Sequence, residues 1–372
     1  MTTTPAAVAD PDPIERIVVF RALALGDLLC ATPALRALHA GFPNADITLV
    51  GLPGSGALTQ RLPYVHEMLS FPGYPGLPES TGDLRELPDF LAHVQTRRFD
   101  LAVQLHGSGE IVNPLVAAFG ARRMAGFDDG RTWSPPQHAQ WMVRWPEHGH
   151  EIERLLALTD GMGLPRKGTH LDFPLQPADR EALNQLWPGA QGSPKPYVCV
   201  HPGSQLPSRR WPLERFAAVG DALVAAGYTV VLTGTAPEAP LVNSVAHQMQ
   251  HKAVNLVGLT DLWTLGALIE KAHSVVCNDT GVSHIAAALR RPSVVINSGG
   301  EVERWRPLDT ERHQVLWHDV PCRPCLYEVC PTGHACAQGV EVDSVLRRLD
   351  LEIPGIFALS SRPVSFQRAV HA

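Results

Sequence analysis

Two successive series of strand-like and helix-like segments are the feature of this sequence that most limits its fold. In the first series, short apolar or β-branched runs predict strands at Arg16–Arg21, Asp46–Gly51, Asp100–Gln104 and Arg122–Phe127. Apolar residues at three- and four-residue spacing predict helices between them, at Asp27–Ala40, Leu84–Arg97 and Ile111–Phe119. Strands and helices of this length that alternate along a chain form a parallel sheet with right-handed crossovers.

The second series begins after the linker-like stretch "WPGAQGSPKP", which ends at Pro196. Strand "YVCVH" is followed by helix "PLERFAAVGDALVAAG", and the alternation continues as far as "PSVVINS". Two such series predict an α/β protein of two Rossmann-like, doubly wound domains that face each other across a cleft, with ligands at the carboxyl ends of the strands. We predict a first domain over residues 14–165, a linker over 166–195, a second domain over 196–350 and a C-terminal tail over 351–372.

The composition narrows the class of protein and its location. A chain of 372 residues is long for one hydrophobic core, which agrees with two domains. The formal net charge of −6 opposes a general nucleic-acid binder, because such proteins usually carry a basic excess. No apolar run approaches the roughly 20 residues that span a bilayer, and the start "MTTTPAAVADPDP" lacks the regions of a secretory signal. We therefore predict a cytoplasmic protein without a transmembrane segment, whose only membrane contact is peripheral.

Asp27 follows the first predicted strand, in the segment "ALGDLL". Gly26 permits a tight turn there, and Asp27 then falls near the start of a predicted helix. An acidic side chain in this place either caps the helix, which is worth about 1 kcal/mol, or takes part in chemistry at the strand end. Taken alone, the segment leaves both interpretations open.

Two loops at predicted strand ends of the second domain carry groups that suit phosphate. In "HPGSQLPSRRWP", Ser204 supplies a hydroxyl and Arg209 a fork-shaped cation. In "CNDTGVSHIAAAL", Thr280 and Gly281 open a helix whose free amides can hold phosphate oxygens, and His284 follows one turn later. Together these groups favour a diphosphate over a neutral ligand. The alternatives are a solvated basic loop and a histidine of the core.

Five segments occur together and in order: "LGDLLCATPALRAL", "HPGS" with "RRWPLERF", "LTGTAPE", "NLVGLTDLWTLGALI" and "NDTGVSHIAAAL". In this combination the chain resembles glycosyltransferase family 9, the ADP-heptose:lipopolysaccharide heptosyltransferases, from about Ile14 to Leu349. The resemblance implies the GT-B type of fold, with an acceptor domain followed by a nucleotide-sugar domain. It also implies metal-independent, inverting transfer of heptose from ADP-heptose to the inner core of lipopolysaccharide, on Kdo-lipid A or a heptosyl acceptor, at the inner membrane surface.

The resemblance assigns roles to single residues. Asp27 matches the proposed general base of the family, and Arg209 stands where the family usually has lysine. Glu238 matches a glutamate associated with the donor nucleoside, and Thr260 falls near the adenine pocket. The donor-diphosphate motif is matched by Asp279, Thr280, Gly281 and His284.

This assignment explains the acid at Asp27 chemically. A sugar hydroxyl is nearly unionised at pH 7, so a carboxylate must take its proton as the oxygen attacks the anomeric carbon. Arg209 and the helix end at Gly281 would meet the charge that develops on the leaving ADP. The only Asp-X-Asp sequence, Asp10–Asp12, lies in the N-terminal tail. We therefore expect that catalysis requires no cofactor or metal.

Four of the seven cysteines fall within 15 residues, in "CRPCLYEVCPTGHAC", at Cys322, Cys325, Cys330 and Cys336. Four thiolates so close in sequence can ligate zinc or iron, and the alternative is a loop of reduced thiols. Similar clusters occur in many members of the family, and a branch that glycosylates autotransporter proteins carries a cysteine-bound iron. Because the cluster follows the donor motif by some forty residues, we expect any metal here to stabilise a loop rather than act on the substrate.

The resemblance leaves the acceptor open. An autotransporter protein is an alternative acceptor, and transfer from another sugar nucleotide is an alternative reaction. Arg97, Arg122 and Arg123 are candidates for contact with acceptor phosphate or Kdo carboxylates. A non-catalytic sugar-nucleotide-binding protein is less compatible with Asp27, and a nicotinamide-dependent dehydrogenase is opposed by the missing G-x-G-x-x-G after the first strand.

Overall fold

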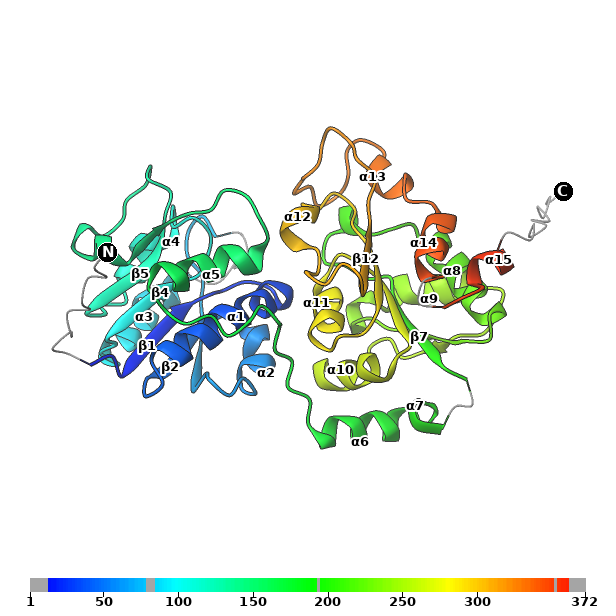
Figure 1. Cartoon of the computed structure of the whole chain (residues 1–372), viewed down its shortest axis with the longest axis horizontal. Coiled ribbons are helices and arrows are strands. Elements are labelled where there is room, and N and C mark those ends of the chain that lie inside the picture. The colour runs from blue at the N-terminus through cyan, green and yellow to red at the C-terminus, as the bar shows by residue number, and fades with distance from the viewer. Residues whose placement is uncertain (1–12, 78–83, 193–194, 351–352, 361–372) are drawn as a thin grey trace, which may run out of the picture. The chain divides into compact units, whose positions relative to one another are not determined.

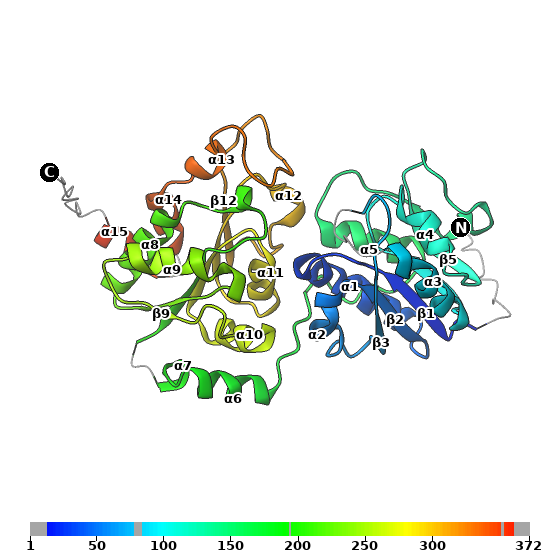
Figure 2. The same ribbon diagram turned by 180° about the vertical axis from the view of Figure 1, so that it is seen from behind.

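A computed structural model describes residues 13–77, 84–192, 195–350 and 353–360, so that Asp10–Asp12 and much of the predicted tail lie outside it. The chain divides into two compact units between Asp172 and Phe173. Each unit contains a six-stranded sheet in which every recorded strand pair is parallel, with helices on both faces (Figure 1 and Figure 2). The prediction of two doubly wound, Rossmann-like domains is confirmed. No helix in the described ranges is long and apolar enough to cross a membrane.

The sheet of the first unit has the strand order β3-β2-β1-β4-β5-β6. Its strands are β1 (Arg16–Phe20), β2 (Asp46–Gly51), β3 (Glu67–Ser70), β4 (Leu101–Gln104), β5 (Arg123–Asp128) and β6 (Met142–Arg144). Its α-helices are α1 (Leu25–Gly41), α2 (Gly56–Thr59), α3 (Leu87–Thr96), α4 (Val112–Ala117) and α5 (Glu151–Gly161). The order reverses between β1 and β4, and open α/β sheets bind ligands at such a point.

Alternation along the central strands builds the core of the first unit. Val18 and Phe20 of β1 point to the same face, where they pack with residues of α3 and α4. The Phe20 ring meets those of Phe71 and Phe119 edge-on, at 5.0 and 6.1 Å between centroids. On the other face α1 packs against α5. The strands are therefore covered on both sides, which leaves the loops at their ends to carry function.

The sheet of the second unit has the order β12-β11-β10-β7-β8-β9, and it reverses between β10 and β7. Its strands are β7 (Tyr197–His201), β8 (Thr229–Leu232), β9 (Val254–Asn255), β10 (Ser274–Asn278), β11 (Ser293–Ile296) and β12 (His313–Leu316). Its longer helices are α6 (Pro177–Leu186), α8 (Leu213–Ala225), α9 (Ala239–Gln248), α10 (Leu262–Lys271), α11 (Gly281–Ala288) and α14 (Val342–Leu349). The shorter ones are α7 (Gly189–Gly192), α12 (Val302–Trp305), α13 (Ala335–Gln338) and α15 (Ile356–Ser360).

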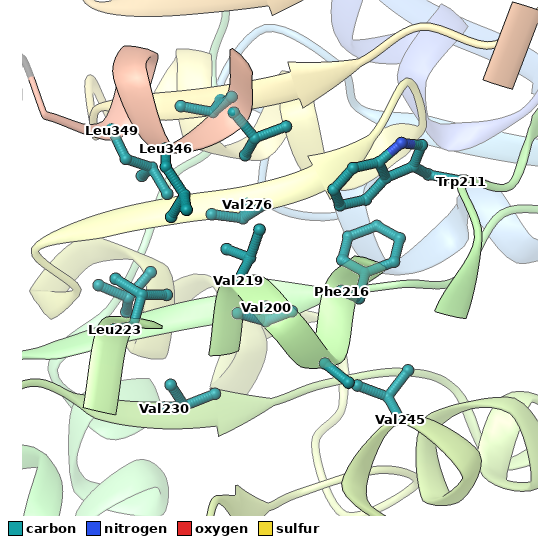
Figure 3. Packing of buried hydrophobic residues seen from close by; sticks show 14 of the residues in the cluster. Val200, Trp211, Phe216, Val219, Leu223, Val230, Val245, Val276, Leu346 and Leu349 are labelled. Carbon is teal, nitrogen blue, oxygen red and sulfur yellow. The ribbon is translucent and has the colours of Figure 1, made fainter. Parts of the chain in front are cut away.

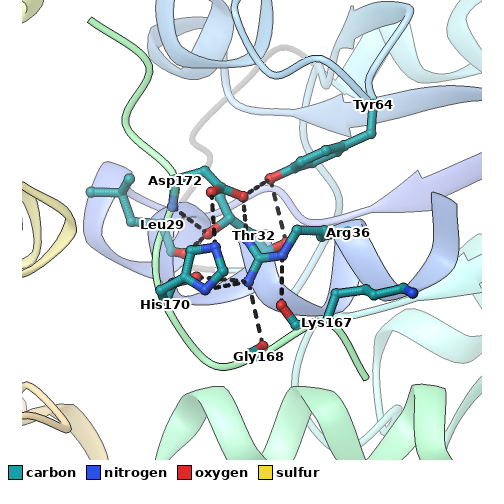
Figure 4. A network of polar contacts seen from close by, with 8 residues as sticks. All are labelled: Leu29, Thr32, Arg36, Tyr64, Lys167, Gly168, His170 and Asp172. Atoms are coloured by element: carbon teal, nitrogen blue, oxygen red, sulfur yellow. Dashed lines mark hydrogen bonds and ion pairs between the residues drawn. The ribbon is translucent and has the colours of Figure 1, made fainter. Parts of the chain in front are cut away.

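The residues that we predicted to form a linker are held by both units in turn. Residues 167–172 lie along α1 (Figure 4), where Arg36 donates to the His170 carbonyl at 2.9 Å and Asp172 accepts from Tyr64 at 2.7 Å. Further along, α6 packs against α10 of the second unit, with Arg180 paired to Glu270 at 2.5 Å. The segment thus contains a docked helix rather than open chain.

Trp211 is the largest fully buried side chain of the second core (Figure 3). Its indole N–H donates to the Val340 carbonyl at 2.9 Å, and its ring meets Phe216 edge-on at 5.1 Å. The indole therefore joins α8 to the segment that leads into α14.

We predict that Trp211→Phe lowers the free energy of unfolding of the second unit by about 2 kcal/mol or more, because it opens a void and removes the buried hydrogen bond from the indole to the Val340 carbonyl. Urea denaturation followed by circular dichroism measures this. The matched control is Trp317→Phe at a residue 43% exposed, which should change stability by no more than about 0.5 kcal/mol. Equal effects of the two substitutions would contradict the prediction.

Candidate functional site

The topology of each sheet predicts a ligand site at its carboxyl edge, at the point where the strand order reverses. In the first unit this point lies between β1 and β4, and in the second between β10 and β7. The segments that follow these four strands include "ALGD", "HGSG", "HPGS" and "NDTG". Asp27, Ser204, Asp279 and Thr280, which were singled out from the sequence, fall in these segments.

Asp27 lies in the first turn of α1, directly beyond the end of β1. The N-cap of the helix is Ala24, so Asp27 is the third helical residue and not the N-cap. The Asp27 side chain is 24% exposed. An acidic group in a first turn is favoured by the helix dipole. The structure therefore presents a partly exposed carboxylate at the point where a ligand is expected.

Two buried residues beside Asp27 were not singled out from the sequence. Arg21 follows β1 and is completely buried, and its guanidinium donates to the Asp27 carbonyl at 3.0 Å. His106 follows β4, is 7% exposed and stacks on the Phe20 ring at 5.2 Å. Burial, and then the charge of Arg21, lower the pKa of His106 to about 3, so the imidazole is neutral at physiological pH. A charged residue directly after an apolar strand was the available signal for Arg21.

The three arginines proposed as acceptor contacts lie at the opposite edge of the sheet. Arg123 is the first residue of β5. Arg122 pairs at 2.9 Å with Asp100, the residue before β4, and Arg97 pairs with Glu67 at the start of β3. These are the amino ends of the strands, whereas the predicted base follows a carboxyl end. The structure does not bring the three arginines and the base together.

Asn278 joins the two donor loops of the second unit. It is the last residue of β10 and is fully buried. Its amide nitrogen donates to the carbonyls of Pro202 and Gly203, at 2.8 and 3.2 Å. Its amide oxygen accepts from the Trp211 backbone N–H at 2.9 Å. One side chain therefore ties both ends of the "HPGS…RRW" loop, which contains Ser204, to the end of β10.

Glu238 lies against this loop. A methyl group on Gly203 would come within 2.1 Å of Glu238 Oε1. The other carboxylate oxygen accepts from the backbone and the hydroxyl of Thr235, each at 2.8 Å, and so caps the turn before α9. Thr260 is half-buried and directly precedes Asp261, the N-cap of α10.

The predicted diphosphate motif forms the start of α11. Thr280 is the N-cap, without a side-chain capping bond, and Gly281 is the first helical residue. Asp279 accepts from the Asn297 amide at 2.7 Å. His284 lies one turn into the helix and is only 6% exposed. The structure brings Asp279, Thr280 and Gly281 to the carboxyl edge, and it places His284 largely inside the unit.

Arg209 contacts the residues after β11 and the segment 317–336, which we call the cysteine loop. Its guanidinium donates to the Ser298 carbonyl at 3.3 Å and to the Cys325 carbonyl. The neighbouring Ser208 N–H donates to the Glu328 carbonyl at 3.1 Å. We expected any metal in this loop to stabilise the loop rather than act on the substrate, and the structure shows that the loop itself contacts the arginine predicted to bind the diphosphate.

Arg323 of the cysteine loop is a second cation at this edge, and it was missed in the sequence. It donates to the Asn297 side-chain oxygen and to the Gly300 carbonyl, each at 2.8 Å. Asn297 in turn donates to Asp279. Its place between two cysteines, in "CRPC", was the available signal.

The four cysteines do not fit a metal site. Cys322 is exposed, whereas Cys336 is buried, and burial raises the pKa of the Cys336 thiol, which disfavours the thiolate that a metal needs. Cys330 Sγ accepts from the His334 backbone N–H at 3.2 Å. Within the described ranges, no three Cys, His, Asp or Glu side chains are placed to hold a metal ion. The prediction of structural zinc or iron at this loop is therefore not supported.

Comparisons with known proteins agree with this geometry. "Lipopolysaccharide heptosyltransferase 2" of Escherichia coli K12 is 28% identical over 304 residues, which cover 76% of this chain and 82% of the relative. The solved structure of a family 9 glycosyl transferase from Veillonella parvula has a TM-score of 0.75 at 19% identity, covering 93% of this chain and 99% of that one. The E. coli ADP-heptose lps heptosyltransferase II structure has a TM-score of 0.69 at 21% identity, covering 91% and 98%.

These solved structures show that the two-unit fold is the GT-B fold of heptosyltransferases. The sequence pattern described as "Glycosyltransferase family 9 (heptosyltransferase)" matches residues 90–336, which is more than half of the chain. The chain therefore belongs to glycosyltransferase family 9, the heptosyltransferase family.

Proposed function

We propose that this glycosyltransferase moves heptose from ADP-heptose to the inner core of lipopolysaccharide, with inversion at the anomeric carbon and with Asp27 as the general base. The observation that carries the proposal is the partly exposed Asp27 carboxylate at the carboxyl edge of the first sheet, in the first turn of α1. The names of the relatives support heptose as the sugar, ADP as the leaving nucleotide and lipopolysaccharide as the acceptor.

The reaction is a single displacement. An Asp27 oxygen takes the proton of the acceptor hydroxyl, and the hydroxyl oxygen forms a bond to the anomeric carbon of heptose. The bond from that carbon to the diphosphate oxygen breaks, and its electron pair leaves with ADP. Attack from the face opposite the leaving group inverts the anomeric configuration.

The second unit supplies the groups that we assign to the donor. The start of α11 offers backbone N–H groups and the positive end of a helix dipole to the diphosphate, beside the cations of Arg209 and Arg323. We assign contacts with ADP-heptose to Ser204, Arg209, Glu238, Thr260, Asp279, Thr280, Gly281 and His284. Since cations and a helix end serve the leaving group, we propose that catalysis uses no metal or cofactor.

The acceptor defines where the enzyme works. Lipopolysaccharide cores are carried by a lipid, so we propose a cytoplasmic enzyme in peripheral contact with the inner membrane. Delipidated core acceptors and an autotransporter protein, assayed in parallel with ADP-heptose, distinguish the proposed acceptor from the alternative.

Asp27→Asn is expected to lower turnover by about 10²-fold or more and to leave ADP-heptose affinity nearly unchanged, because the amide cannot accept the proton. Initial rates of ADP release and calorimetric titration measure the two quantities. Asp89→Asn is the matched control, since Asp89 is an exposed acid in the first turn of α3 in the same unit. Turnover of Asp27→Asn within a few-fold of the wild type would remove Asp27 from the mechanism.

Arg209→Ala and His284→Ala should each weaken ADP binding by about 1.5–3 kcal/mol, the usual contribution of a hydrogen bond to a charged group. Calorimetry with ADP tests this, and Arg209→Lys should restore part of the affinity. Arg312→Ala removes a surface arginine paired with Asp309 and should leave ADP binding unchanged. If neither Arg209→Ala nor His284→Ala changes the affinity, the nucleotide binds elsewhere.

Initial rates in excess EDTA should equal those without it, because the proposed site neutralises the diphosphate with arginines and a helix end. The same assay with added magnesium or manganese is the control. Loss of turnover in EDTA that either ion restores would show that the metal-independent mechanism is wrong.

A further inference from the structure

Arg21 places a full positive charge inside the first unit. Its side chain is completely buried, and a buried guanidinium is costly unless charges and hydrogen-bond acceptors surround it. One amino group donates to the Leu105 carbonyl at 2.6 Å, which joins the ends of β1 and β4. The other donates to the Asp27 carbonyl at 3.0 Å and to Glu151 Oε1 at 3.1 Å, and it lies 3.9 Å from Asp27 Oδ1.

Charged side chains of both signs lie close to Arg21. Glu151, in the first turn of α5, is 1% exposed and lies 3.6 Å from Arg154, whose guanidinium stacks over the Trp145 ring at 4.2 Å. Glu151 therefore lies within 4 Å of two buried arginines, and Asp27 is a further acidic side chain beside Arg21. His106 adds none, since its imidazole is neutral at physiological pH. A positive charge held 3.9 Å from a carboxylate attracts its ionised form, and Arg21 is in that position relative to Asp27.

We propose that Arg21 is the positioning residue of the catalytic base: it fixes the backbone of Asp27 and holds a positive charge beside its carboxylate, so that the base is ionised and oriented when the acceptor hydroxyl arrives. This inference rests on the proposed function. Glu151 is the counter-charge that permits the guanidinium to be buried in that place.

The geometry separates this role from simple packing. At 3.9 Å the guanidinium is close enough for charge attraction but too far for a hydrogen bond to the carboxylate, so it does not compete for the oxygen that takes the proton. It instead hydrogen-bonds the backbone of the same residue. A lysine can supply the charge, but it lacks the planar fork that reaches the Leu105 and Asp27 carbonyls and Glu151 together.

The test compares Arg21→Met, Arg21→Lys, Asp27→Asn and the double variant Arg21→Met/Asp27→Asn in turnover and in the pH profile of kcat. We expect Arg21→Met to lower kcat by about 10²-fold through misplacement of the base. The acidic limb of the pH profile of this variant should move to higher pH by about 0.7 unit or more. Loss of a unit charge about 4 Å away in water changes a pKa by about that amount. Arg21→Lys should keep the limb near its original position while kcat stays reduced.

The double variant shows whether Arg21 acts through Asp27. We expect it to be no more than a few-fold slower than Asp27→Asn alone, because the residue that Arg21 positions is already lost. The proposal would be overturned if the loss of kcat in the double variant equalled the product of the losses in the two single variants. It would also be overturned if the acidic limb of Arg21→Met stayed at its wild-type pH. Arg36→Met is the matched control. It breaks the ion pair between Arg36 of α1 and Asp172, and it should not move the acidic limb of the pH profile.

Two further measurements keep the outcomes distinct. ADP affinity and melting temperature are recorded for each variant, since a merely structural Arg21 lowers the melting temperature without moving the pH limb. If Arg21→Met does not fold, the test depends on Arg21→Lys alone. A kcat equal to that of the wild type in Arg21→Lys would contradict a role for the planar guanidinium of Arg21. Near-wild-type turnover of Asp27→Asn, by contrast, refutes the proposed base itself, whereas an inactive Asp27→Asn with an unaffected Arg21→Met refutes only the role of Arg21.

Discussion

The hydrogen bonds of the buried Asn278 amide are the interaction on which the donor edge of this glycosyltransferase depends. They connect the end of β10 to the carbonyls of Pro202 and Gly203 and to the backbone of Trp211. Each of these groups, buried and unpaired, would cost about 1–3 kcal/mol. Because the loop between Gly203 and Trp211 carries Ser204 and Arg209, the amide places the predicted phosphate ligands and the Trp211 anchor of the core with the same bonds.

In the first unit, a charged side chain rather than an amide holds the backbone at the carboxyl edge of the sheet. Parallel strands end at one edge, where a side chain at the end of a central strand, or directly after it, hydrogen-bonds the neighbouring backbone. In the second unit that side chain is neutral and fully hydrogen-bonded. In the first unit it is Arg21, which requires Glu151 beside it and gives the neighbouring Asp27 an electrostatic environment that an amide could not supply.

The central strands and the loops that follow them could be predicted from the sequence because buried parallel strands are continuous apolar runs. The edge strands β3, β6 and β12 were missed. "EMLS" and "MVR" are short and only half-buried, so they lack that signal. The segment of α6 was assigned to a linker, but it forms a helix that buries Asp179 and Leu183. Arg122 and Arg123 are a different case: their place at the start of a predicted strand already indicated the amino edge.

The candidate site could likewise be predicted from the sequence only in part. Sequence alone left Asp27 between helix cap and base because the decision depends on where the helix begins, which is a matter of the backbone at Ala24. The contacts of Arg209 with the cysteine loop join residues more than one hundred positions apart, and no local pattern reports such a distance. The spacing of the cysteines suggested a metal, but spacing does not decide whether four thiols converge.

The anomeric configuration of the product is the most direct test of the central claim, which is heptose transfer by base-assisted single displacement. Purified enzyme is incubated with ADP-heptose and a delipidated core acceptor, and the product is analysed by NMR, with other sugar nucleotides as parallel donors. The account predicts one heptose per acceptor, released ADP, and an anomeric configuration opposite to that of the donor. Retention of configuration, or transfer only from a different sugar nucleotide, would contradict it.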